Sequence, residues 1–91
     1  MAIVTLRYWA AAKDAAGVAE EKVEAGTLAA ALAAGLAAAR DRPGDAAQRL
    51  RLVMARSSFL IDGEPAGTRS PGSLSLADDS VIEVLPPFAG G

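Results

Sequence analysis

The sequence predicts an α+β roll, in which a small mixed sheet packs against one long helix. Three segments lead to this fold class. An alternating apolar segment opens the chain, an alanine- and leucine-rich segment with helical periodicity follows, and a nearly continuous apolar segment lies close to the end. If the first and last segments are neighbouring central strands, they run parallel and the helix covers one face of the sheet.

The composition limits the chemistry that the chain can carry. Its 91 residues include no Cys and no His, which excludes disulfides, thiolate nucleophiles, imidazole bases and ordinary Cys or His metal sites. We therefore expect no bound metal. The length favours a single domain that covers residues 1–91.

The charge pattern argues against nucleic-acid and membrane partners. The formal net charge is −2 and the basic residues are scattered, whereas nucleic-acid-binding proteins carry a basic stripe or patch. The longest uncharged run, residues 25–39, is short and alanine-rich for a membrane span. The first residues lack the basic and apolar pattern of a secretory signal. We expect a cytoplasmic protein.

The beginning of the chain predicts two strands joined by a short helix. Residues 2–8 alternate as a half-buried strand does, and residues 9–16 form an alanine-rich segment that ends at Gly17, a candidate C-cap. Within this segment we interpret Trp9 as a core or edge packing residue and not as a binding platform. Residues 19–25 carry a charged face and predict a second strand, paired with the first and exposed on one side.

The main helix is predicted to begin after Thr27, a good N-cap, and to end at Pro43. Gly35 costs about 1 kcal/mol relative to Ala in a helix interior, and a close approach to the sheet is the expected compensation. Arg40 and Arg42 lie where a helix C-terminus favours cations. The apolar stripe at helical spacing consists of Leu28, Leu32 and Leu36, with Ala31, Gly35 and Ala39 beside them.

A second, shorter helix is predicted over residues 46–55, where Asp45 can act as its cap. Its apolar members are Leu50, Val53 and Met54. Three arginines are expected on its outside, namely Arg49, Arg51 and Arg56. We interpret them as a solvated face, with binding of an acidic partner as the alternative.

Residues 57–65 predict a strand that closes on an Asp62-Gly63 turn, a strong hairpin signal. Pro65 limits the returning strand to an edge of the sheet. Residues 68–75 are rich in Gly, Pro and Ser and predict a loop.

From this loop, Leu74 and Leu76 are expected to return to the core. Residues 78–80 form a further tight turn. Residues 81–85 are nearly all apolar, which is typical of a strand in the centre of its sheet.

The last residues follow that strand without a charged or polar spacer. Because Pro86 and Pro87 fix φ and lack an N–H group, the sheet must end there. We expect residues 86–91 to form an extended, flexible C-terminal tail. Gly90 and Gly91 have no Cβ, so this end can enter a slot that admits only backbone. The alternative is an idle tail, since chain ends are commonly disordered.

Together with the order of elements, three segments give the chain a family resemblance. It resembles the sulfur-carrier group of the ubiquitin-like β-grasp proteins, the MoaD/ThiS family, and most of all the MoaD small subunit of molybdopterin synthase. The family often has a Gly in the turn before the last strand, where this chain has residues 77–80 (ADDS). The segments are residues 4–12 (VTLRYWAAA), 59–63 (FLIDG) and 81–91 (VIEVLPPFAGG).

The resemblance implies a function for the tail. In that family a separate ubiquitin-activating-type enzyme uses ATP to adenylate the terminal glycine carboxylate, which is then converted to a thiocarboxylate that donates sulfur. The resemblance places this chemistry on Gly91. It implies two partners, the adenylating enzyme and a MoaE-like large subunit of molybdopterin synthase. The chain itself would bind no cofactor, because the ATP is used by the activating partner, and would not be an enzyme alone.

Contacts with these partners are expected next to the reactive end. The expected contact residues are Leu85, Pro87, Phe88, Ala89 and Gly90. Phe88 has the alternative of folding back on the sheet.

Other functions stay open at this point. A carrier of the same chemistry can serve thiamine, cysteine or secondary-metabolite synthesis, although thiamine carriers tend to lack the segment 46–55. A ubiquitin-like modifier would instead join Gly91 to lysines of other proteins. A plain interaction domain would have an inert tail.

Overall fold

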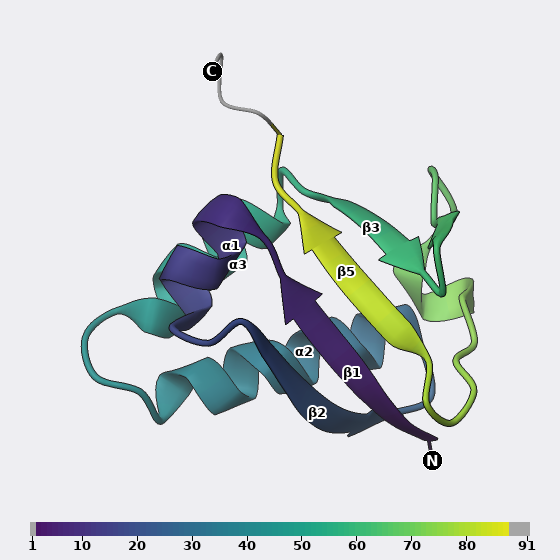
Figure 1. The fold of residues 1–91 in the computed structure, drawn as a ribbon, viewed down its shortest axis with the longest axis horizontal. Helices are drawn as coiled ribbons and strands as arrows, with labels where there is room; N and C mark the ends of the chain where they lie inside the picture. Colours follow the sequence, from purple (N-terminus) through teal and green to yellow (C-terminus); the bar gives the residue numbers. More distant parts are fainter. Residues whose placement is uncertain (1, 88–91) are drawn as a thin grey trace.

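The computed structural model describes residues 2–87 and contains one five-stranded mixed sheet. The strand order is β2-β1-β5-β3-β4 (Figure 1). β1 and β5 are parallel neighbours, and the other pairs are antiparallel, as expected for the first and last strands. The bounds are β1 (Ala2–Tyr8), β2 (Glu20–Ala25), β3 (Ser58–Ile61), β4 (Glu64–Pro65) and β5 (Val81–Leu85).

The helices lie on one side of this sheet, which confirms the α+β prediction (Figure 1). α2 runs across the sheet, while α1 and α3 pack together beside it. The prediction of a short helix from Trp9 was one residue too long, since α1 begins after it. The helical segments are α1 (Ala10–Ala16), α2 (Leu28–Arg40), α3 (Ala46–Met54) and the single 3₁₀ turn η1 (Pro71–Ser73).

The core lies between the sheet and the helices. Alternate residues of β1 and β5 face it, as the pleat of a strand requires. Leu74 is buried and Leu76 packs partly against the core, so both return to it as predicted. The largest fully buried side chains are Tyr8, Leu6, Leu28, Leu50, Ile82, Val4 and Val84.

The buried face of α2 is the predicted apolar stripe, with its small residues at the centre. The helix buries Leu28 and a row of small residues, whereas Leu32 and Leu36 are only partly buried at its sides. The small side chains let the helix axis lie close to the sheet, which leaves room for the two leucines only beside the contact.

Gly35 marks the closest approach of α2 to the sheet. A Cβ at this position would lie 2.6 Å from the Tyr8 hydroxyl oxygen and 2.8 Å from Cδ1 of Leu6. The expected compensation for a glycine inside a helix is therefore present, because a larger residue would collide with β1.

The helix termini match the predicted caps with one exception. Thr27 Oγ1 accepts a hydrogen bond from the Ala30 N–H at 3.1 Å, and Gly17 caps α1 in the left-handed region with φ 82°. Asp45 occupies the N-cap position of α3 but its side chain makes no capping hydrogen bond. Its backbone is not extended (φ −106°, ψ 34°), and the extended conformation is the one that turns a capping side chain toward the helix.

Candidate functional site

β5 is the element from which the predicted site projects. It lies between β1 and β3, and its last residue, Leu85, pairs with Ser58. Pro86 and Pro87 follow at once, the first half-buried and the second exposed. The strand therefore leaves the centre of the sheet directly, at the position that we call the exit of β5 (Leu85–Pro86).

The start of β5 is fixed by a side chain from the hairpin that follows β3. The Asp62 carboxylate accepts the Val81 N–H at 2.8 Å and the buried Ser80 hydroxyl at 3.0 Å. Asp62 and Gly63 both have positive φ (52° and 85°), the backbone that a two-residue hairpin turn requires. The predicted hairpin is present, and it also holds the neighbouring strand.

A second contact fixes the turn before β5 to the first strand. The Asp78 carboxylate accepts the Ile3 N–H at 3.0 Å, and the Asp79 N–H donates to the Ile3 carbonyl at 2.8 Å. Asp79 has φ 68°, so it adopts the left-handed conformation that a glycine would adopt at lower cost. The departure from the family pattern at this turn leaves the fold unchanged.

Trp9 holds the far end of β5. Its backbone N–H donates to the Val84 carbonyl at 3.2 Å, and its indole Nε1–H donates to Glu83 Oε1 at 3.0 Å. The side chain is 46% exposed, so Trp9 is an edge residue and not a core residue. No sequence pattern predicts the bond between the Trp9 indole and Glu83. The place of Trp9 does follow from the topology, because β1 and β5 are parallel neighbours and the residue after β1 lies beside the end of β5.

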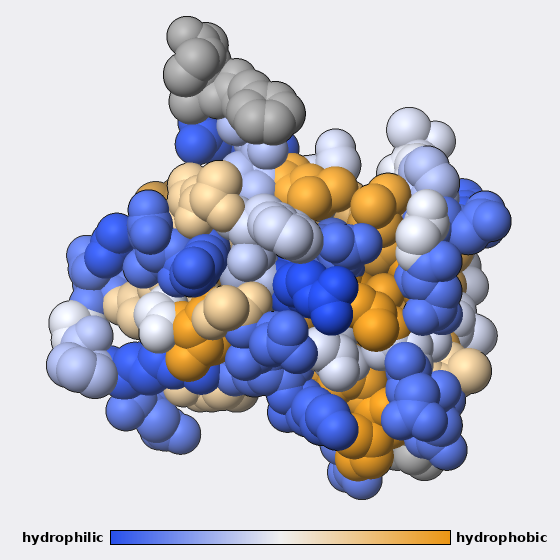
Figure 2. Space-filling view, viewed as in Figure 1, coloured by the Kyte–Doolittle hydropathy of each residue, from blue (hydrophilic) through white to orange (hydrophobic). Residues whose placement is uncertain are grey.

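The sheet face opposite the helices is here called the open face. It is turned toward the viewer in Figure 2 and borders the exit of β5. Apolar side chains are interspersed with charged ones on this face. Leu85, predicted to contact a partner, lies half-buried on it. The open face of the two central strands consists of Ile3, Thr5 and Arg7 of β1 with Val81, Glu83 and Leu85 of β5.

A hollow beside Trp9 is lined by both basic and acidic side chains. Arg7, Lys13 and Glu20 line it together with Trp9, and Arg7 pairs with Glu20 at 3.6 Å. The surface next to the exit of β5 therefore combines an aromatic ring with an ion pair and a lysine.

A polar network on the helix side of the sheet joins β1, β2 and the end of α2. Glu21 accepts the Tyr8 hydroxyl at 2.6 Å and an Arg42 guanidinium N–H at 2.8 Å. Arg42 also donates to the Ala16 carbonyl at 2.9 Å. Burial, followed by the hydrogen bond with Glu21, raises the pKa of Tyr8 well above its ordinary value. The network is satisfied internally and holds the tyrosine neutral, so it acts as structure.

The structure brings only part of the predicted site into view. Leu85 and Pro87 lie at the end of the described chain, as stated above. The predicted site residues outside the described range are Phe88, Ala89, Gly90 and Gly91.

Within residues 2–87, the acidic side chains form no group of three or more that could hold a metal ion. In the same range, the helices are too short or too polar to cross a membrane.

Solved structures share this architecture over nearly their whole length. Small archaeal modifier protein 1 from Methanosarcina acetivorans superposes with a TM-score of 0.78 at 22% identity, covering 100% of this chain and 98% of that one. The protein of the same name from Haloferax volcanii gives 0.71 at 23% identity, covering 98% and 99%.

A third match is a molybdopterin-converting factor from Helicobacter pylori, solved as a complex of subunits 1 and 2. It has a TM-score of 0.64 at 20% identity and covers 98% of this chain and 99% of that one. The chain has the ubiquitin-like β-grasp fold. No protein-family model matches the sequence, and no curated protein matches it.

The β-grasp fold is the one that the sequence resemblance implied. MoaD-like proteins and small archaeal modifier proteins are both among its structural neighbours. At these identities the likeness establishes the β-grasp architecture.

Proposed function

We propose that this chain is a sulfur carrier whose Gly91 carboxylate is adenylated and then converted to a thiocarboxylate. One observation carries the proposal. The central strand of a β-grasp sheet is held at both ends and leads at once into Pro86-Pro87, after which the sequence is uncharged and finishes in two glycines. Such a strand is a rigid support for an extended end.

The proposed chemistry needs only the terminal carboxylate of this chain. A carboxylate oxygen attacks the α-phosphorus of ATP and pyrophosphate leaves, so the poor acyl electrophile gains a good leaving group. Hydrosulfide then attacks the acyl carbon and AMP leaves, which gives the thiocarboxylate. The sequence contains no Cys and no His, so the adenylating partner supplies the acids, bases and nucleophiles.

The tail sequence suits entry into a partner's site. Gly90 and Gly91 lack a Cβ and fit a channel that admits only backbone. Pro86 and Pro87 favour an extended conformation that loses little entropy on binding. We propose Leu85, Pro87 and Phe88 as partner contacts, together with Ala89 and the glycines.

For the pathway, we propose that a MoaE-like large subunit accepts the sulfur, in the cytoplasm. The Helicobacter pylori neighbour, a complex of subunits 1 and 2 of a molybdopterin-converting factor, supports this choice. The modifier proteins of Methanosarcina and Haloferax have the higher TM-scores. They support the second candidate, a ubiquitin-like modifier whose Gly91 is joined to lysines.

Both candidates begin with adenylation, so ATP–pyrophosphate exchange tests their common step. With the adenylating enzyme of the source organism, we expect exchange that depends on the full chain and is abolished when Gly91 is deleted. The control is K22Q, an exposed substitution on β2, which should leave the exchange rate unchanged. Exchange of equal rate with and without Gly91 would contradict the proposal.

Carrier and modifier are then separated by the product. A carrier accumulates free thiocarboxylate, whereas a modifier accumulates in covalent adducts of higher mass that resist boiling in detergent and reductant. Adducts without free thiocarboxylate would favour the modifier.

A further inference from the structure

The outer face of α3 is a surface that the fold does not use. α3 packs against α1 and α2 through Ala46, Leu50 and Met54. Its remaining face points outward and includes Leu52, which is 56% exposed. The exposed residues of this face and of the turn that follows the helix, here called the α3 face, are Gln48, Arg49, Arg51, Leu52, Ala55 and Arg56.

The helical spacing orders the α3 face. Arg49 and Leu52 lie one turn apart on α3, at i and i+3, and Arg56 lies in the turn that follows the last helical residue, Met54. Arg51 lies on the other side of the face, with Leu52 and Ala55 between it and the other arginines. An apolar strip is thus flanked by guanidinium groups, which is the arrangement of a protein interface with an apolar centre and a polar rim.

The arginines of this face form no ion pair in the described part of the chain, although Asp45 and Asp14 line the same hollow as Arg49. Within residues 2–87, the ion pairs are Arg7–Glu20 and Arg42–Glu21, so the arginines of the α3 face pair with no carboxylate in that range. Residues 40–56 carry five of the seven arginines and two of the eleven acidic residues, a net of +3. The rest of the chain carries −5, which gives the total of −2.

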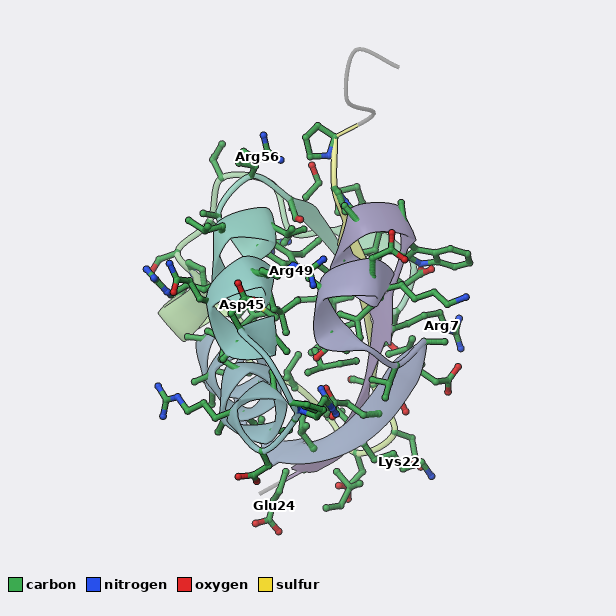
Figure 3. The ribbon with its side chains drawn as sticks, turned by 90° about the vertical axis from the view of Figure 1, so that its left-hand side faces the viewer. Arg7, Lys22, Glu24, Asp45, Arg49 and Arg56 are labelled. Carbon is green, nitrogen blue, oxygen red and sulfur yellow. The ribbon has the colours of Figure 1, made fainter. Side chains whose placement is uncertain are left out.

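The α3 face also adjoins the exit of β5. Arg56 lies two residues before Ser58, and Ser58 pairs with Leu85, the last residue of β5. Figure 3 shows Arg56 at the end of the molecule where β5 leaves the sheet, and Lys22 and Glu24 at the opposite end. A protein that receives the tail therefore has the α3 face within reach.

We propose that the α3 face docks on an acidic, partly apolar surface of the enzyme that adenylates Gly91. This inference rests on the proposed function. Both candidate functions, carrier and modifier, begin with adenylation and so require the adenylating enzyme as a partner. The guanidinium groups meet carboxylates of the enzyme, and Leu52 fills an apolar recess between them. A protein surface fits better than nucleic acid, because the centre of the face is aliphatic and the rest of the chain is acidic.

Steady-state ATP–pyrophosphate exchange at increasing carrier concentration tests this assignment. In the full chain, R49Q/R56Q is expected to raise the KM for the carrier about fivefold at low salt with kcat unchanged, since rim charges act mainly on association. L52A is expected to raise KM by a similar factor of about five. The matched control R40Q/K22Q removes the same charge from exposed sites outside the face and should change KM by less than about twofold.

Salt provides a second readout. The difference in KM between wild type and R49Q/R56Q should vanish at about 1 M salt, where the screening length falls to roughly 3 Å, while the effect of L52A should persist. Circular dichroism and thermal unfolding of each variant exclude loss of folding as the cause, because the substituted side chains are exposed.

Three outcomes would overturn the inference. If wild type is adenylated but R49Q/R56Q and L52A keep its KM and salt dependence, the docking surface is wrong and the proposed function stands. If wild type is not adenylated, both fail. If KM is unchanged while the two arginines are needed to bind a single-stranded RNA oligonucleotide or to self-associate in sedimentation, the face has another occupant.

Discussion

At the scale of single residues, Tyr8 shows how a buried polar group can be tested cleanly. It is the chain's single tyrosine, it is 2% exposed, and its hydroxyl donates to Glu21 at 2.6 Å. Burial raises its pKa above the ordinary value of 10.0, and the neighbouring carboxylate raises it further. Ionised tyrosine is therefore strongly disfavoured in the folded protein.

The raised pKa predicts a stability that depends on pH. A group whose pKa is higher in the folded than in the unfolded state contributes its full stabilisation below the unfolded pKa, and loses it above. We expect the free energy of unfolding to fall as pH rises above about 10, the ordinary pKa of tyrosine. Urea unfolding across this range checks the slope, and tyrosinate absorbance should be absent from the folded protein there.

Y8F is the control for this prediction. It removes the ionisable group, so the part of the alkaline slope that Tyr8 causes should disappear. Tyrosinate absorbance that develops near pH 10 in the folded wild type would contradict the account.

Single residues also show where sequence reasoning succeeds. The Thr27 cap, the Gly17 C-cap and the role of Gly35 depend on local backbone or on helix packing, and all three were predicted correctly. The indole bond of Trp9 to Glu83 joins residues far apart in sequence, so no local pattern reveals it. Asp45 has the right residue type for a cap, but the turn before it sets a backbone that prevents the bond.

At the scale of elements, β5 depends on contacts that its own sequence does not contain. The hairpin turn at Asp62 was predicted from its residue types, but its carboxylate bonds to Val81 and Ser80 were not. The prediction for α2 was one stripe of leucines and small residues. In the structure Leu28 and the small residues are buried, and the two later leucines pack partly buried beside them. Periodicity finds the buried side of a helix, and close packing against the sheet decides which residues fit at its centre.

The Asp62 contacts give a prediction for the anchoring of β5. D62A leaves the Val81 N–H and the buried Ser80 hydroxyl without this acceptor and places alanine at φ 52°. We expect a loss of about 2–3 kcal/mol in the free energy of unfolding, since each broken bond costs about 1 kcal/mol and the left-handed backbone adds to it. Urea unfolding measures the change.

D62N serves as the matched variant for this site. Asparagine keeps an acceptor oxygen and tolerates positive φ, so we expect it to recover at least half of the loss. Equal stability of D62A and wild type would show that the turn does not hold β5.

At the scale of the whole molecule, the parallel pairing of β1 with β5 puts the end of the chain on the central strand. This topology was predicted from the two most regular apolar segments and from the family resemblance. The outward position of the three arginines was also predicted, with a solvated face as the interpretation and an acidic partner as the alternative. Only the folded structure shows that Leu52 is exposed among them and that Arg56 lies beside the exit of β5. The predictions for residues 88–91 came from the pattern of the tail and from the family resemblance, and these residues lie outside the described range.

In the proposed function, the folded domain is a rigid support for the Gly91 carboxylate. The most direct measurement is the intact mass of the full chain after incubation with ATP, the adenylating enzyme and a sulfide donor. We predict that one oxygen is replaced by sulfur, that fragmentation places the change on Gly91, and that a chain lacking Gly91 does not react. An unchanged mass under conditions in which the enzyme activates its other substrates would contradict the central claim.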